Sequence, residues 1–220
     1  MAAVANAWMP GVERADGTIT GGRLHGGAPR AVWHTTESDP KELSARAIAR
    51  ELGDDERAAH LVWNPVNGEI VQLLPATAAA TRRPQGTATD WAQEGRVCVR
   101  VLVLGHSAFP FTNGPLIGLD RILEWLDSWG VPRHWPAGSP IPRPASLPRP
   151  RSVRLWAQGG HFGQSQVPGS KADGPGAIDI ERMRGAAIPR PRPEQAPSTS
   201  PQPVWRSHNG TRPHATTSPS

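Results

Sequence analysis

Residues 159–180, with the sequence GGHFGQSQVPGSKADGPGAIDI, carry side chains that could build part of a metal site. This segment contains the imidazole of His161, the ammonium group of Lys171 and the carboxylate of Asp173, which stands directly before Gly-Pro-Gly. Imidazole and carboxylate groups are the ligands of hydrolytic zinc sites, which keep one position open for water. A catalytic metal site is seldom built from one segment, so a further ligand is expected elsewhere in the chain.

A second candidate ligand is His34, which ends the apolar run Ala-Val-Trp and opens onto the loop that begins Thr-Thr-Glu. A histidine at the end of a buried strand is well placed to hold a metal ion. It is also well placed to be a structural residue held by hydrogen bonds. The local sequence leaves both interpretations open.

The first half of the chain contains the patterns of a strand, a helix and a hairpin. Residues 30–36 form a short apolar run typical of a buried strand. Residues 38–55 predict a helix that Asp39 caps, with Pro40 in its first turn and Leu43, Ala47, Ile48 and Leu52 on its buried face. Residues 59–75 predict a hairpin with its turn at Asn67-Gly68.

The second half adds a central strand and another helix. Residues 96–105 are strongly apolar and predict a strand in the middle of a sheet. Residues 114–132 predict an amphipathic helix with one apolar face, formed by Leu119, Ile122, Leu123 and Leu126. The order β-α-β-β-β-α predicts an α/β domain with a mixed central sheet flanked by helices.

Composition divides the 220 residues into an ordered part and a tail. We expect one domain over residues 5–187. Residues 188–220 are rich in Pro, Ser and Thr, and their few apolar side chains cannot offset the entropy of ordering, which predicts a disordered tail. The single cysteine, Cys98, lies in an apolar run and is expected to be buried and inert, so the fold needs no oxidising compartment.

The net charge of +5 suits an anionic partner such as nucleic acid or a cell-wall polymer, and equally a solvated arginine-rich surface. No nucleic-acid-binding motif is present, so we expect no specific nucleic-acid partner. The first residues lack the basic and apolar regions of a signal peptide, which predicts synthesis in the cytoplasm without one. No apolar run approaches the ~18 residues of a membrane span.

Five segments together resemble one enzyme family. They are AVWHTTES, AHLVWNPVNGEIVQLLPATAAA, VCVRVLVLGHSAFPFTNGP, ILEWLDSWGVPRHWPAG and GGHFGQSQVPGSKADGPGAIDI. In order and spacing they resemble the zinc-type N-acetylmuramoyl-L-alanine amidases that are related to peptidoglycan-recognition proteins and phage lysins, with actinobacterial and actinophage members nearest. The resemblance covers roughly residues 7–182.

This resemblance implies a fold, a metal and a reaction. The fold is that of the peptidoglycan-recognition proteins and amidases. Zn²⁺ is held by two histidines and a carboxylate or thiolate, and it activates water against the lactyl amide between muramic acid and the stem peptide. The matching positions imply that His34 and Asp173 are ligands and that Lys171 stabilises the oxyanion, although Gly174 is inserted into the family's Lys-x-Asp-Pro-Gly pattern.

Two departures from the family pattern fall on chemical positions. Gln164 stands where near relatives have the second histidine, and an amide oxygen is a poorer zinc ligand than imidazole. Leu102 stands where they have the glutamate base of the central strand, and the chain has no tyrosine to replace it. His161 is the nearby imidazole that could take over the ligand role, and Glu37 is the nearest carboxylate that could take over as base.

We therefore expect a peptidoglycan hydrolase of the amidase type, impaired at Gln164 and Leu102, with weakly bound Zn²⁺. The alternative is an inactive homologue that binds peptidoglycan. In either case the partner is peptidoglycan, with no membrane and no specific nucleic acid, and the chain is a monomer. Without a signal peptide, the protein would act on the cell wall once released.

Overall fold

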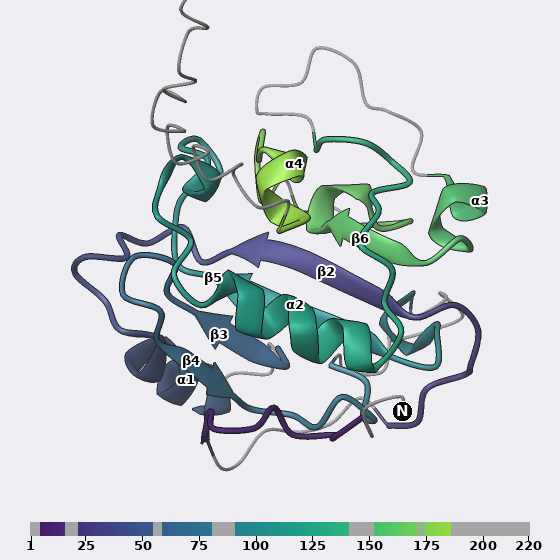
Figure 1. The fold of residues 1–220 in the computed structure, drawn as a ribbon, viewed down its shortest axis with the longest axis horizontal. Coiled ribbons are helices and arrows are strands. Elements are labelled where there is room, and N and C mark those ends of the chain that lie inside the picture. Colours follow the sequence, from purple (N-terminus) through teal and green to yellow (C-terminus); the bar gives the residue numbers. More distant parts are fainter. Residues whose placement is uncertain are drawn as a thin grey trace, which may run out of the picture. The chain divides into compact units, whose positions relative to one another are not determined.

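The computed structural model describes residues 5–15, 22–54, 59–80, 91–140, 152–170, 172 and 174–185, which include a six-stranded mixed sheet. The strand order is β1-β4-β3-β5-β2-β6 (Figure 1). The strands are β1 Glu13–Arg14, β2 Arg30–Thr35, β3 Leu61–Trp63, β4 Ile70–Gln72, β5 Cys98–Val103 and β6 Gly160–Gly163. β3 and β4 pair antiparallel and the other neighbours pair parallel. The predicted α/β fold with a mixed central sheet is confirmed.

Two neighbouring interior strands of the sheet, β5 and β2, arise from two of the predicted apolar runs. They pair in parallel over their full length, from Arg30 opposite Cys98 to Thr35 opposite Val103. The Cys98 side chain is buried, as predicted. Side chains of a strand alternate between the two faces of a sheet, so β2 and β5 each contribute to two separate cores.

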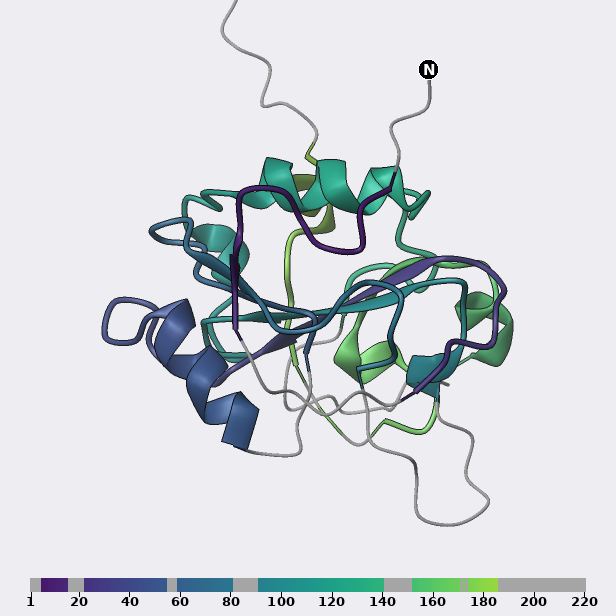
Figure 2. The same cartoon turned by 90° about the horizontal axis from the view of Figure 1, so that it is seen from below.

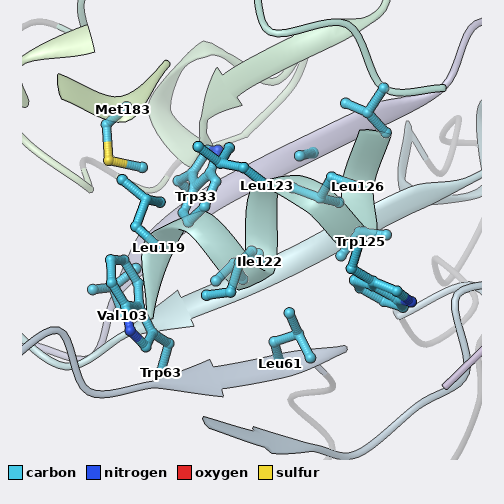
Figure 3. Packing of buried hydrophobic residues seen from close by; sticks show 14 of the residues in the cluster. Trp33, Leu61, Trp63, Val103, Leu119, Ile122, Leu123, Trp125, Leu126 and Met183 are labelled. Atoms are coloured by element: carbon cyan, nitrogen blue, oxygen red, sulfur yellow. The ribbon is translucent and has the colours of Figure 1, made fainter. Parts of the chain in front are cut away.

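One face of the sheet is covered by α2 (Leu119–Ser128), which Figure 2 shows lying along it. All four residues predicted for its apolar face are buried, and Trp125 joins them. Figure 3 shows Leu119, Ile122 and Leu123 packing toward Trp33 and Trp63 of β2 and β3. The hydrophobic periodicity of this segment therefore predicted the helix and the face that it buries.

The opposite face of the sheet packs partly against α1 (Ala45–Asp54), which begins later than predicted. Its first turn is held by Ser44, whose Oγ accepts a hydrogen bond from Ala47 N at 3.0 Å. Asp39 instead holds a preceding turn, accepting from Lys41 N at 2.8 Å. The prediction that Asp39 caps the helix was wrong, because the chain turns once more before the helix starts. Leu43 is consequently exposed.

Because α1 begins at Ala45, its buried face differs from the predicted one by part of a turn. Ile48 and Leu52 are buried as predicted, but Ala47 is exposed. Ala45 and Ala49 are buried in its place, and they pack with residues of β3 and β4. The small side chains let this end of the helix approach the sheet.

The remaining described elements are short. The hairpin β3–β4 has its turn at Gly68, whose φ of +79° suits glycine, as the Asn-Gly pair predicted. β1 and β6 were not predicted as strands, since two and four residues carry too little periodicity. Three 3₁₀ turns and two single-turn helices complete the described part: η1 Trp91–Gln93, η2 Phe111–Asn113, η3 Gln164–Gln166, α3 Val153–Trp156 and α4 Ile180–Met183.

The predicted tail over residues 188–220 lies outside the described residues. Among the helices that the structure describes, none combines the length and apolar character that crossing a membrane requires.

Candidate functional site

The candidate site lies where the parallel strands β5, β2 and β6 end side by side. His34 is the fifth residue of β2 and pairs in register with Leu102 of β5. On the other side of β2, Trp33 pairs with Gly163, the last residue of β6, so Gln164 follows β6 next to His34. Crevices at the carboxyl ends of parallel strands are common ligand sites, because loops leave the sheet there. Three positions singled out in the sequence thus come together.

These side chains lie on the sheet face opposite α2. Ala31 and Trp33 of β2 pack in the core beneath α2, whereas Val32 packs in a different cluster with Phe162. Strand alternation therefore places His34 on the Val32 face. On β5, Leu102 packs against the α1 cluster and so occupies the same face.

Arg100 brings a positive charge to this face. It pairs with Val32 in register, two residues before Leu102. Its Nη2 donates a hydrogen bond to Oε1 of Gln164 at 3.3 Å, and its Nη1 donates to the carbonyl oxygen of Ala80 at 3.4 Å. The guanidinium group thus reaches the amide that stands where a second zinc-binding histidine was expected.

Gln164 is oriented by contacts at both ends of its amide. Oε1 accepts from Arg100, and Nε2 donates to Oγ of Ser170 at 3.2 Å. The Ser170 oxygen also accepts a hydrogen bond from Ala172 N at 3.2 Å. A chain of polar groups therefore links β5 to the loop that follows η3.

The segment after this loop packs directly against His34. A methyl group added at Gly174 would lie 2.8 Å from Cδ2 of His34 and 2.9 Å from Oγ1 of Thr35. Ser165 N donates to the Gly174 carbonyl oxygen at 2.9 Å, which fixes this segment beside η3. Lys171 and Asp173 lie outside the described residues. Their predicted roles, oxyanion stabiliser and zinc ligand, stay predictions.

Glu37, the predicted substitute base, ties two loops together at this end of the sheet. Its Oε1 accepts from the Thr35 hydroxyl at 2.6 Å and from Ser107 N at 2.9 Å. Its Oε2 accepts from the Ser107 hydroxyl at 3.1 Å. Partial burial opposes ionisation of Glu37, but these hydrogen bonds and nearby His106 outweigh it and hold the pKa below its usual value. An ionised carboxylate with several donors already bound is a weak proton acceptor.

His161 lies on the other face of the sheet from His34. It pairs in register with Ala31, and its Nδ1 accepts a hydrogen bond from Nε1 of Trp33 at 3.0 Å. Its ring stacks between Trp33 and Trp135 under α2. Burial lowers its pKa to about 3, opposed by the nearby charge of Asp127 and aided by smaller effects of His134 and Arg133. The structure therefore does not bring His161 to His34, because consecutive strand positions point to opposite faces.

The described side chains do not by themselves complete a zinc site. His34 supplies imidazole, but the neighbouring donor is an amide oxygen that already accepts from a guanidinium group. Among the described residues, no three His, Cys, Asp or Glu side chains form a group able to hold a metal.

Most residues of this site were predicted from the sequence, but the hydrogen bond between Arg100 and Gln164 was not. Arg100 lies within the apolar run predicted as the central strand, and nothing in the sequence indicated that it reaches Gln164, 64 positions away. A charged residue inside the run VCVRVLV was the available signal, since such a side chain needs a polar partner when half-buried. Ser170 was missed because a serine in a Gly-rich loop carries no signal of its own.

Comparison of the sequence with protein-family models and with curated proteins gave no match. Comparison with solved structures gave amidases and endolysins. The endolysin N-acetylmuramoyl-L-alanine amidase LysCS from Clostridium intestinale URNW is 11% identical, with a TM-score of 0.47 over 81% of this chain and 96% of that one. A selenomethionine derivative of AmpD is 15% identical, with a TM-score of 0.45 over 83% and 98%. The Ph2119 endolysin from the Thermus scotoductus MAT2119 bacteriophage Ph2119 is 14% identical, with a TM-score of 0.40 over 74% and 87%.

Proposed function

We propose that this chain recognises peptidoglycan through an amidase-type domain, with the muramoyl–peptide junction at the edge formed by β2, β5 and β6, and that its hydrolytic activity is weak. One observation carries the proposal. His34 and Gln164 lie at the ends of neighbouring strands, with the Gly174 segment packed on His34. This is the juxtaposition expected from the five sequence segments that resemble the amidases.

Weak hydrolysis follows from what these positions contain. Leu102, beside His34 on the adjacent strand, cannot accept a proton. Glu37 is engaged by Thr35 and Ser107. A positioned general base contributes roughly 10²–10⁴ in rate, and the described residues offer none at the expected place. Recognition does not depend on that group and can persist without it.

A second candidate function is an active zinc amidase, and the anchoring of Gly174 against His34 favours it. Asp173 precedes Gly174 in sequence, so a ligand pair of His34 and Asp173 with a third donor is the arrangement this candidate requires. It predicts one tightly bound zinc per chain and turnover at rates typical of enzymes.

Two measurements on the purified full chain test the proposal. Sedimentation with insoluble peptidoglycan measures binding, and chromatography of the supernatant measures released stem peptides. We expect saturable binding with slow or undetectable release, and less than one zinc per chain by elemental analysis. An absence of binding contradicts the proposal, whereas stoichiometric zinc with rapid release establishes the second candidate.

A further inference from the structure

Phe109 is the most exposed large apolar side chain of the described residues, at 75%. The other two phenylalanines of the chain, Phe111 and Phe162, are buried. Phe109 lies in the loop after β5, at the end of the sheet that carries the candidate site. Single exposed apolar residues are common on protein surfaces, so exposure alone does not indicate a function. What distinguishes Phe109 is how the backbone that carries it is held.

Phe109 ends a tight turn formed by residues 106–109. Its N–H donates to the His106 carbonyl oxygen at 3.1 Å, and the two residues form an isolated antiparallel bridge. Their rings meet edge to face, with the centroids 6.5 Å apart and an interplanar angle of 88°. In this geometry His106 covers at most one face of the phenyl ring, so a face of the exposed ring is open to a ligand.

On one side this turn is held by Glu37, three residues after His34. The Glu37 carboxylate accepts from the backbone N–H and the hydroxyl group of Ser107, and Glu37 N donates to the Gly105 carbonyl oxygen at 2.9 Å. Glu37 has a φ of +58°, which residues with a side chain seldom adopt. These hydrogen bonds hold Glu37 in that conformation and fix the loops after β2 and β5 to each other.

On the other side the turn contacts the segment that covers His34. A Cβ added at Gly176 would collide with the carbonyl oxygen of Ser107, so the two backbones are in close contact. Gly176 comes two residues after Gly174, which packs on the His34 ring. The turn is therefore a fixed part of the rim of the candidate site, and Phe109 lies exposed on that rim.

The sequence around Phe109 carries no permanent charge. Residues 101–119 contain no Asp, Glu, Lys or Arg, although these types make up 20% of the chain. His106 and Asn113 instead offer hydrogen-bonding groups near the ring. An aromatic ring in such a setting suits a saccharide, whose pyranose rings present C–H groups on a face and hydroxyl and acetamido groups at the edge. An anionic lipid or a carboxylate would favour a basic loop.

We propose that Phe109 is a saccharide-binding residue, which stacks on a pyranose ring of the glycan strand beside the muramoyl–peptide junction. This identification of the ligand rests on the proposed function. Stem peptides are attached to the glycan through muramic acid, so a protein that holds the junction necessarily has glycan at the rim of its site. Phe109 adds affinity for that glycan and none for the free stem peptide.

Substitution of the ring tests the proposal on the full chain. Peptide-free glycan strands, prepared from peptidoglycan by removing the stem peptides, are titrated into each protein by calorimetry. We expect Phe109→Ala to bind these strands roughly tenfold more weakly, and Phe109→Trp to retain the affinity, because the larger ring still offers a face for stacking. Val153→Ala is the matched control, an exposed apolar residue on α3, before the opposite end of β6. Circular dichroism checks that each variant is folded.

Glu37 is a positioning residue in this proposal, and a double-mutant cycle tests that role. We expect Glu37→Ala to weaken glycan binding severalfold in the native chain, because the turn that carries Phe109 loses the bonds to Ser107. In the Phe109→Ala background the same substitution should have a much smaller effect, because no ring remains to be positioned. Equal effects in both backgrounds would show that Glu37 does not act through Phe109.

The outcomes separate this inference from the proposed function. Equal affinity of the native chain and Phe109→Ala for the peptide-free glycan, or no binding of it by the native chain, overturns the inference even if insoluble peptidoglycan is bound. Binding of phosphatidylglycerol vesicles that Phe109→Ala loses, with glycan binding unchanged, assigns the ring to a membrane surface and also overturns it. Failure of the native chain to bind insoluble peptidoglycan overturns the proposed function, and the inference with it.

Discussion

At the scale of single residues, Arg100 and Gln164 set the chemistry of the candidate site together. The hydrogen bond between Arg100 Nη2 and Gln164 Oε1 joins a charged residue of the central strand to one of the two positions at which this chain departs from the family that it resembles. Either change alone would leave a mismatch: a histidine beside a guanidinium group, or an amide beside a metal ion. Substitutions at Arg100 and Gln164 therefore have to be tested both singly and together.

The first prediction is that Gln164→His raises zinc affinity only modestly, whereas Gln164→His combined with Arg100→Gln raises it by several powers of ten. Imidazole is a far better zinc ligand than an amide oxygen, but the guanidinium charge opposes the ion until it is removed. Isothermal titration with zinc on the two variants and the native chain measures this. Tight zinc binding by the native chain would contradict the reasoning.

Hydrolysis should stay slow in both variants, because Leu102 still occupies the expected base position. Adding Leu102→Glu to the double variant should increase the release of stem peptides from peptidoglycan by roughly 10²–10⁴. A matched control is Leu102→Gln, which has a similar size and cannot act as a base.

The second prediction concerns acid stability and depends on His60. This fully buried imidazole accepts from Arg100 N at Nδ1, so its Nε2 carries the proton and donates to the Ala78 carbonyl oxygen at 2.9 Å. Burial, opposed by the bond to Ala78 and aided by the charge of Arg100, lowers its pKa to about 4. Burial likewise lowers the pKa of His161, to about 3.

The unfolded chain binds protons at these histidines near pH ~6.5, but the folded chain does so only near pH 4 and 3. The free energy of unfolding should therefore fall as the pH drops from about 6.5 toward 4, by up to about 1.4 kcal/mol per pH unit for each histidine. Urea unfolding at several pH values measures this slope. His60→Gln should reduce the slope, whereas His25→Gln, an exposed control, should not. Equal slopes in the native chain and His60→Gln would show that His60 does not control acid stability.

At the scale of elements, the site depends on parallel strands that end together and on a loop that closes against them. β2 lies between β5 and β6, so one strand aligns His34 with both neighbours. The loop after η3 then returns to pack Gly174 on the His34 ring. Neither the strands nor the loop alone would bring the residues of the candidate site together.

The third prediction is that Gly174→Ala weakens peptidoglycan binding substantially while leaving the sheet folded. The added Cβ would lie 2.8 Å from His34 and 2.9 Å from Thr35, so the ring or the loop has to move. Gly114→Ala is the control, since its Cβ would meet only a carbonyl oxygen at 3.2 Å, outside the site. Sedimentation with insoluble peptidoglycan measures binding, and circular dichroism measures folding. Unchanged binding in Gly174→Ala would mean that this contact does not shape the site.

At the scale of the whole molecule, the sequence combines an α/β domain with a basic, Pro-rich segment after it. The described residues build cores on both faces of the sheet, one under α2 and others on the α1 side. Residues 188–220 contain few apolar side chains that could extend these cores.

The fourth prediction is that removal of the residues after Arg190 leaves the melting temperature of the domain unchanged within error. A segment that buries little apolar surface contributes little to stability. Differential scanning calorimetry of the full and shortened chains measures this. A drop of several degrees would show that the removed segment packs on the domain.

The sequence by itself determined the elements whose periodicity is strong and local. The apolar face of α2, the β3–β4 turn at Gly68 and the buried strands β2 and β5 could all be predicted, because side-chain burial along one element repeats at a fixed interval. The start of α1 could not, since Asp39 and Ser44 both suit a cap and only packing against the sheet selects one.

For the site, the sequence identified His34, Leu102 and Gln164 by their resemblance to a family pattern, and tertiary structure decided how they meet. It placed His161 beneath α2, away from His34, because strand register fixes the face of every side chain. It also joined Arg100 of β5 to Gln164, which directly follows β6, and β2 lies between these two strands. Contacts of this kind depend on sheet order and register, which long-range pairing sets and which local sequence patterns do not encode.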